Sequence, residues 1–185
     1  MSVRVLALVG SLRAASYNRQ IAELATHVAP EGVEVSIFEG LGDVPFYNED
    51  IDVPGALPEA ARRLREASEA AAAFLVVSPE YNGTIPAVVK NTIDWLSRPY
   101  GSGAISGKPV AVIGGSVSQF GAKWAHDDIR RSVGIAGGAV VEDVELSVGH
   151  FGTRFAETKV KDDAELTNQV SAVLAKLAAA TAPSA

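Results

Sequence analysis

Short apolar segments alternate with helical patterns along almost the whole chain, and this alternation constrains its fold more than any other feature. Strands separated by helices imply a parallel sheet covered by helices on both faces. The segments 3–9, 33–38, 73–77, 108–114 and 137–141 read as five strands, and 144–155 reads as irregular. We expect a helix after each strand: the first capped by Ser16, three at about 58–72, 86–97 and 121–132, and the last from Asp162, with Glu165 as its capping-box partner.

This pattern predicts one α/β domain built on a doubly wound, five-stranded parallel sheet. The chain has 185 residues without a linker or an internal repeat, so we expect a single domain over 1–178 and a flexible tail over 179–185. The flavodoxin-like strand order 2-1-3-4-5 fits five strands with helices on both faces. In that order the turns after the first, third and fourth strands meet at the carboxyl edge of the sheet, where such folds bind ligands.

The turn after the first strand is rich in groups that bind anions. Hydroxyls of Ser11 and Ser16, the amide of Asn18 and the guanidinium of Arg13 lie around the start of a helix. No acidic residue precedes Glu23, so no carboxylate competes with an anion for the helix N-terminus. The turn lacks both the Walker motif and Gly-x-Gly-x-x-Gly, which favours a monophosphate. An ordinary capped helix start with surface arginines is the alternative.

The turn after the third strand, 78–86, has a composition that is unusual for a plain connection. Pro79 and Pro86 stiffen its two ends. Tyr81 is large and partly apolar, Asn82 offers both a donor and an acceptor, and Gly83 lets a ligand approach the backbone. We interpret this turn as a platform for the edge of a planar ring that forms hydrogen bonds.

Composition argues against several other classes of function. The net charge of −6 and the pI of about 5.1 disfavour nucleic acids and anionic membranes, which need a basic surface. The sequence has no cysteine, and its three histidines are far apart, so we expect no metal site. It has no apolar run near the roughly 20 residues of a membrane span and no signal-peptide pattern, so we expect a cytoplasmic protein.

Three motifs together resemble those of the NAD(P)H-dependent FMN reductase family, which includes quinone, azo-dye and chromate reductases. They are the segment 10–13 with Ser16 and Asn18, the segment 78–86, and the segment 90–95 with 97–99. The resemblance extends from Val3 to about Leu177. The turn after the fourth strand departs from the family pattern, because Val117, Gln119 and Phe120 are bulky and Lys123-Trp124 follow.

The resemblance implies roles for individual residues. The FMN phosphate would be held by Ser11, Arg13, Ser16 and Asn18, and the isoalloxazine ring would lie against Pro79, Glu80, Tyr81, Asn82, Gly83 and Ser116.

The resemblance also implies an activity. A bound FMN would take a hydride from NADPH or NADH and pass it to a quinone, an azo compound, chromate or free flavin in ping-pong kinetics. Because the flavin carries this chemistry, no catalytic side chain is assigned. A flavodoxin-type electron carrier, or a flavin reductase that treats FMN as a diffusing substrate, remain alternatives.

The resembled family further implies a homodimer or homotetramer with each flavin near a subunit boundary. The long loop after the second strand carries Phe46 and Tyr47, and the helix after the platform carries Trp95 and Leu96. We expect part of this apolar surface to form the contact between subunits, although it can also cover the core of a single subunit.

Overall fold

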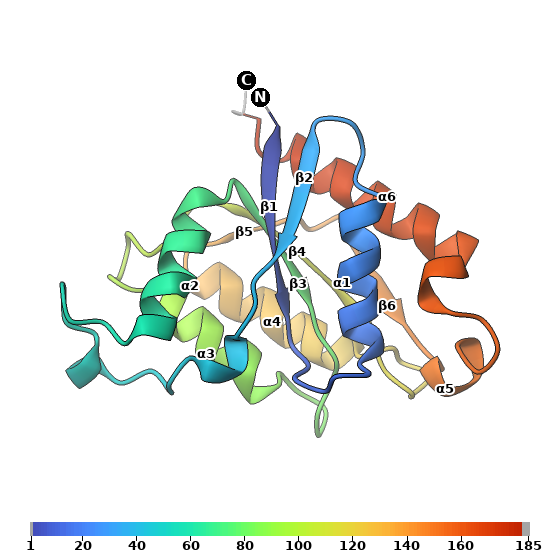
Figure 1. The fold of residues 1–185 in the computed structure, drawn as a ribbon, viewed down its shortest axis with the longest axis horizontal. Coiled ribbons are helices and arrows are strands. Elements are labelled where there is room, and N and C mark those ends of the chain that lie inside the picture. Colours follow the sequence, from blue (N-terminus) through green and yellow to red (C-terminus); the bar gives the residue numbers. More distant parts are fainter. Residues whose placement is uncertain (1, 183–185) are drawn as a thin grey trace.

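The computed structural model describes residues 2–182 and consists of one sheet between two layers of helices (Figure 1). Short 3₁₀ turns cover Leu41–Asp43, Glu49–Ile51 and Val160–Asp162. In chain order, the other elements are β1 (Val3–Val9), α1 (Tyr17–His27), β2 (Val33–Ile37), α2 (Glu59–Ala70), β3 (Ala73–Val77), α3 (Ala87–Leu96), β4 (Pro109–Gly115), α4 (Lys123–Ile135), β5 (Ala139–Val140), β6 (Leu146–Val148), α5 (Phe151–Arg154) and α6 (Ala164–Ala179).

The strand order β2-β1-β3-β4-β5 confirms the predicted doubly wound topology, with every pair parallel. The expected irregular segment 144–155 is wrong, because it contains β6 and α5. The last position of the sheet is shared: β5 pairs with the first residues of β4, and β6 pairs with Ile113–Gly115 at its carboxyl end. A strand of three residues is too short to show a periodicity of its own, which is why the sequence pattern missed it.

Each face of the sheet has its own apolar core. Alternate side chains of the inner strands point to opposite faces, as the period of a strand requires. One core joins β1, β3 and β4 to helices α1 and α6, and the other joins the same strands to α2, α3 and α4. The two groups of helices lie on opposite sides of the sheet in Figure 1.

Helix boundaries differ from the prediction by one to three residues, and at the last helix the cap itself is a different residue. Asp163, rather than Asp162, caps α6 by accepting a hydrogen bond from Leu166 N–H at 2.9 Å. The 3₁₀ turn that ends at Asp162 explains the shift, and Glu165 pairs with Arg154 at 3.1 Å instead of closing a capping box. Helix α6 continues to Ala179, so the expected tail begins later, and its residues 183–185 lie outside the described part. Helices α2 and α3 are shorter at each end than expected, and α4 starts and ends later.

The long loop between β2 and α2 is fastened to helix α3. The Asn91 side chain accepts from Tyr47 N–H at 2.8 Å and donates to the carbonyls of Val44 and Pro45. Trp95 Nε1 also donates to the Pro45 carbonyl, at 2.8 Å. Trp95 and Leu96 are both fully buried, so the expectation that they supply free apolar surface is wrong: the loop and the core cover them.

Gly114, the second-last residue of β4, lies so close to the end of β3 that there is no room for a side chain. Its φ is 137°, which L side chains rarely adopt. A Cβ at this position would lie 2.4 Å from the Ser78 carbonyl oxygen and 2.6 Å from Asn18 Oδ1. Both neighbours are held in the interior, so neither can move aside cheaply.

We predict that Gly114→Ala lowers the free energy of unfolding by about 2–6 kcal/mol, because steric overlap and backbone strain each cost about 1–3 kcal/mol. Gly134→Ala is the matched control, since Gly134 lies in α4 with open space around it. That change should be neutral or stabilise by up to about 1 kcal/mol. Urea unfolding of both variants measures the difference, and equal midpoints would contradict the close approach.

Candidate functional site

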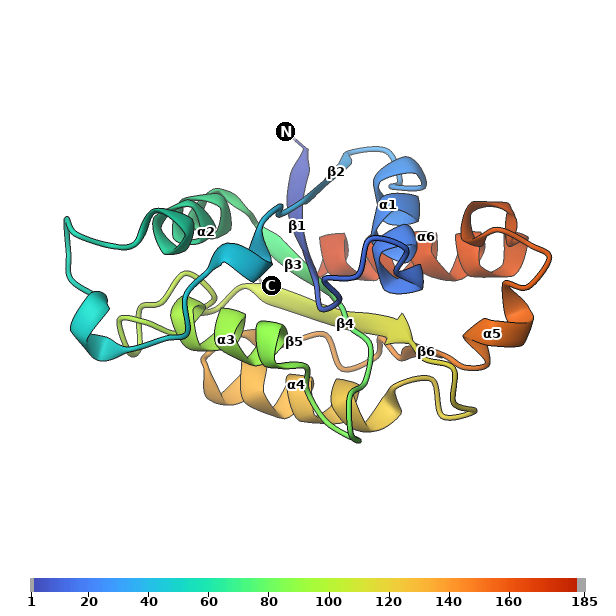
Figure 2. The same ribbon diagram turned by 60° about the horizontal axis from the view of Figure 1, so that its bottom comes forward.

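Three turns meet at the carboxyl edge of the sheet, as the strand order predicts. They follow β1 (residues 10–16), β3 (78–86) and β4 (116–122), and Figure 2 shows the three strands ending at the same side of the molecule. The first two turns touch directly: a Cβ on Gly10 would lie 2.8 Å from Ser78 Oγ and 3.2 Å from the Pro79 ring. Most of the residues assigned from the resemblance therefore lie around one edge.

The turn after β1 presents a set of unused hydrogen-bond donors. Ser16 caps α1 by accepting from Arg19 N–H at 3.3 Å, which confirms the predicted N-cap. Among the described residues, the backbone N–H groups of 11–15, Tyr17 and Asn18 have no protein acceptor. Arg13 is exposed beside them. Free N–H groups at a helix N-terminus together with a guanidinium fit a phosphate well.

The Asn18 side chain has a different role from the phosphate contact that the resemblance implied. Its side chain is 4% exposed and forms two hydrogen bonds with the backbone of Gly115: Nδ2 donates to the carbonyl at 3.0 Å, and Oδ1 accepts from N–H at 2.9 Å. The amide thus uses its oxygen and one of its two N–H donors inside the protein and fastens α1 to the end of β4. Its backbone N–H, rather than its side chain, is the group free for an anion.

Arg19, unlike Arg13, already has acidic partners and is not free to bind an anion. Its guanidinium donates to Glu23 at 2.9 Å and to both carboxylate oxygens of Glu39, which lowers the pKa of the Glu39 carboxyl. These groups line a hollow of about 340 Å³ on the β2 side of the first turn. Ser11 and Arg13 line the same hollow. Because Arg19 holds both carboxylates, Arg13 is the cation of this hollow that has no acidic partner among the described residues.

The platform turn is a small β-hairpin. Tyr81 and Thr84 exchange two backbone hydrogen bonds, and Asn82 and Gly83 between them have φ angles of 53° and 76°. Positive φ at both central positions is the signature of a type I′ turn, for which Asn-Gly is the preferred pair. The turn geometry by itself accounts for this pair, so the unusual composition of the turn is no sign of a ligand at these two positions. That Asn82 and Gly83 border a ring stays a prediction. The Tyr81 side chain is 51% exposed above the sheet edge.

Ser116 begins the turn after β4 and is anchored to the segment behind it. Its N–H donates to the Val148 carbonyl at 3.1 Å, and its Oγ lies 3.0 Å from Ser118 Oγ. Residues 150 and 151 donate to the carbonyls of Ser118 and Ser116. The third turn therefore depends on the end of β6, the element that the sequence did not reveal.

Helix α4 is attached to the platform through His126, a residue that sequence reasoning passed over. The ring is 2% exposed, with Nε2 at 2.9 Å from the Ser78 carbonyl oxygen and Nδ1 at 2.8 Å from Ser147 Oγ. A carbonyl only accepts, so Nε2 carries the proton and Nδ1 accepts from the Ser147 hydroxyl. Burial lowers the pKa of His126 to about 4, which keeps the ring neutral. No signal in the sequence distinguishes this histidine from a surface one.

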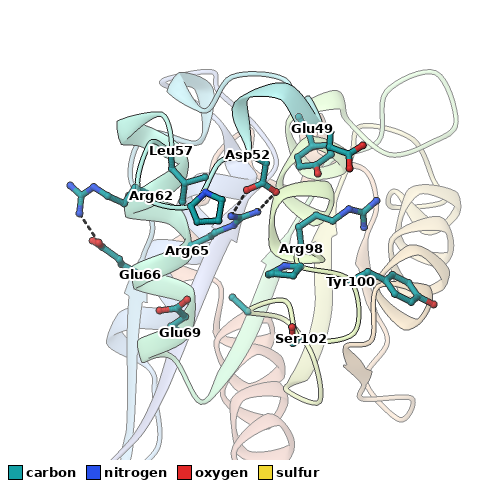
Figure 3. Close-up of a pocket in the computed structure, with 14 residues that line it drawn as sticks. Glu49, Asp52, Leu57, Arg62, Arg65, Glu66, Glu69, Arg98, Tyr100 and Ser102 are labelled. Atoms are coloured by element: carbon teal, nitrogen blue, oxygen red, sulfur yellow. Dashed lines mark hydrogen bonds and ion pairs between the residues drawn. The ribbon is translucent and has the colours of Figure 1, made fainter.

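A larger cavity of about 880 Å³ lies away from the three turns (Figure 3). It lies beyond the C-terminal end of α3, whose other end follows the platform. Its main polar feature is the ion pair of Arg65 with Asp52, at 2.6 Å, in which Arg65 lowers the pKa of the carboxyl. Both of these charged groups already have partners, and Arg98 stacks on Tyr47. We therefore place the functional site at the three turns and not in this cavity.

The state of His126 predicts a stability that depends on pH. An unfolded chain protonates a histidine near pH 6.5, whereas the folded chain takes up this proton only near pH 4. Stability should therefore fall as the pH drops from 6.5 toward 4, by up to about 1.4 kcal/mol per pH unit. Urea unfolding between pH 7 and 4.5 measures this slope. His126→Gln is the control and should have a flatter profile; identical slopes would contradict a neutral buried His126.

Comparisons with known proteins agree with this geometry. The sequence profile of the NADPH-dependent FMN reductase family matches residues 3–153. The chain is 38% identical to a quinone reductase of Pseudomonas putida over 159 residues, which is 86% of this chain and 84% of that protein. It is 34% identical to a 2-hydroxy-1,4-benzoquinone reductase of a Burkholderia species over 154 residues, 83% of this chain and 82% of that protein.

Solved structures show the same relationship. The flavoenzyme NAD(P)H:(acceptor) oxidoreductase FerB of Paracoccus denitrificans superimposes with a TM-score of 0.80 at 32% identity, covering 95% of this chain and 97% of FerB. An azoreductase of Bacillus anthracis, 18% identical with a TM-score of 0.57 over 97% of this chain and 98% of its own, shares the fold. The sequence match and the three turns at the sheet edge lead to one conclusion: this chain belongs to the NADPH-dependent FMN reductase family.

Proposed function

We propose that the protein is an FMN-dependent NAD(P)H oxidoreductase that reduces quinones, with azo compounds, chromate and free flavin as further acceptors. The observation that carries this proposal is the set of unpartnered donors after β1, beside a rigid platform after β3. A ligand in which a short chain joins a phosphate to a planar ring could place the phosphate at the donors and the ring at the platform. The quinone reductases among the similar proteins support a quinone as the acceptor.

FMN, when bound, supplies the chemistry by taking a hydride from NAD(P)H and delivering it to the acceptor. The chain itself binds and orients. Arg13, the hydroxyls of Ser11 and Ser16, and the free N–H groups of the first turn would hold the phosphate. Pro79–Gly83 and Ser116 would border the ring from two sides, on turns that hydrogen bonds to α4 and to the end of β6 hold in place.

Two alternatives differ from this proposal in what the protein does with its flavin. An electron carrier would hold FMN and show no turnover with NAD(P)H. A flavin reductase would bind FMN only as a passing substrate. Carriers usually surround the flavin with acidic residues; here the first turn has none, and the Glu80 carboxylate accepts from Ala125 N–H at 3.1 Å. This arrangement favours the enzyme with bound flavin.

The proposed assembly is a homodimer or homotetramer in the cytoplasm, and both parts stay predictions. Phe46, which is 78% exposed, and the exposed Tyr100 supply apolar surface for a subunit contact. Trp95 and Leu96 are no longer candidates because they are buried. Of the helices in the described part of the chain, none combines the length and the apolar character that crossing a bilayer requires.

An absorbance spectrum of the purified protein, followed by anaerobic additions of NADH and NADPH, tests the function. We expect the flavin absorbance to stay with the protein through gel filtration, to bleach with at least one nucleotide, and to return when a quinone is added. Retained flavin that neither nucleotide bleaches would indicate a carrier. A colourless protein that nevertheless oxidises NAD(P)H only with added FMN would indicate a flavin reductase.

We predict that Arg13→Ala weakens FMN binding by roughly 1.5–3 kcal/mol, or about 10–150-fold, the usual worth of a hydrogen bond to a charged group. Arg62→Ala is the matched control: Arg62 is a surface arginine on α2 that pairs with Glu59 and Glu66. Quenching of FMN fluorescence measures both affinities. If the two variants bind FMN equally well, the phosphate lies elsewhere.

A further inference from the structure

The β3–β4 ladder stops abruptly at Ser78, and side chains replace its next hydrogen bonds. Ser78 N–H still donates to the Ile113 carbonyl, at 2.9 Å. One more step of a parallel ladder would pair Gly115 N–H with the Ser78 carbonyl. Instead, Gly115 N–H donates to Asn18, and the Ser78 carbonyl accepts from His126 Nε2. Two side chains thus satisfy the two backbone groups that would otherwise have bonded to each other.

This exchange lets the chain leave the sheet after Ser78 without an unsatisfied polar group. A buried carbonyl without a partner costs about 1–3 kcal/mol, so a strand that departs from its neighbour needs a substitute donor. His126 is that donor, and its ring is fixed from behind by the Ser147 hydroxyl of β6 at 2.8 Å. The direction of the Ser78–Pro79 peptide, which starts the platform, is therefore set by a side chain on α4.

Two further contacts fasten the platform to the same helix. Ala122, at the N-cap of α4, has no side chain able to cap, and the Glu80 carboxylate accepts from Ala125 N–H instead. Thr84 Oγ1 donates to Asp128 Oδ2 at 2.7 Å, on the other arm of the hairpin. Both contacts are more open to solvent than that of His126, which is the buried one of the three.

We propose that His126 is a positioning residue for the flavin: its Nε2–H fixes the Ser78 carbonyl and, through the Ser78–Pro79 peptide, the height and tilt of the platform against the ring. This inference rests on the proposed FMN-dependent function. His126 touches neither the flavin nor the acceptor in this role. It acts through the backbone that would border the isoalloxazine.

Two amide substitutions test the two hydrogen bonds of His126 one at a time. The terminal amide of Gln reaches the place of Nε2, so His126→Gln keeps a donor for Ser78. The shorter amide of Asn reaches the place of Nδ1, so His126→Asn keeps the contact with Ser147 and leaves the Ser78 carbonyl without a donor. Ser147→Ala is the matched control, because it removes the second partner of the ring but not the bond to Ser78.

Three readouts are measured on the full chain: the FMN dissociation constant, the midpoint potential of the bound flavin, and amide hydrogen exchange at Tyr81 and Thr84 without flavin. We expect His126→Asn to weaken FMN binding about tenfold or more, to shift the potential, and to speed exchange of both amides. His126→Gln and Ser147→Ala should stay within about threefold of the wild type in affinity, even if Ser147→Ala lowers the unfolding midpoint.

Each result has a distinct meaning. If His126→Asn folds and matches the wild type in affinity, potential and exchange, the inference is overturned. It is also overturned if Asn, Gln and the Ser147 control are impaired alike, since the effect would then follow stability alone. If the wild type binds no FMN, the proposed function fails; faster exchange in His126→Asn but not in His126→Gln would still support the positioning of the platform.

Discussion

The point at which β3 and β4 part is the feature on which the rest of the site depends. Parallel strands that part must leave a donor and an acceptor unpaired, and in the interior this is costly. The chain resolves the conflict with Asn18, which bonds Gly115 as a neighbouring strand would, and with His126, which takes the Ser78 carbonyl. Gly114 leaves the space for this close arrangement. At this point of the sheet, side chains of α1 and α4 thus bond to the backbone at the ends of β3 and β4.

The junction also decides which groups of the first turn are free to bind a ligand. Because the Asn18 side chain is engaged with β4, the first turn binds through backbone N–H groups, hydroxyls and Arg13. The neighbouring Arg19 is paired with Glu23 and Glu39, so Arg13 is the cation of this turn that has no acidic partner among the described residues. A single phosphate would therefore meet the free N–H donors of this turn together with the unpaired charge of Arg13.

Support from distant parts of the chain makes the turns rigid. The platform is attached to α4, the turn after β4 is attached to the end of β6, and the long loop before α2 is attached to α3 through Asn91 and Trp95. In each case a loop is bonded to a helix or a strand that itself belongs to the core. A site made of loops keeps its geometry when its supports are fixed in this way.

The sequence by itself determined the class of fold and the positions of the three turns that form the site, because periodicity and turn residues are local properties. The strand order followed from the order that doubly wound sheets of this kind adopt. The sequence also identified the Ser16 cap and the acid-free first turn. Only the tertiary structure decided which polar side chains face a ligand and which face the protein. In the sequence, Asn18 and His126 look like side chains that are free to bind a ligand, because their hydrogen-bond partners lie in distant segments. Asn82 and Gly83 look like ligand contacts, although the geometry of the turn already accounts for them. The three-residue β6, which supports the third turn, was missed because a strand so short is defined by its pairing with β4 and not by its own pattern.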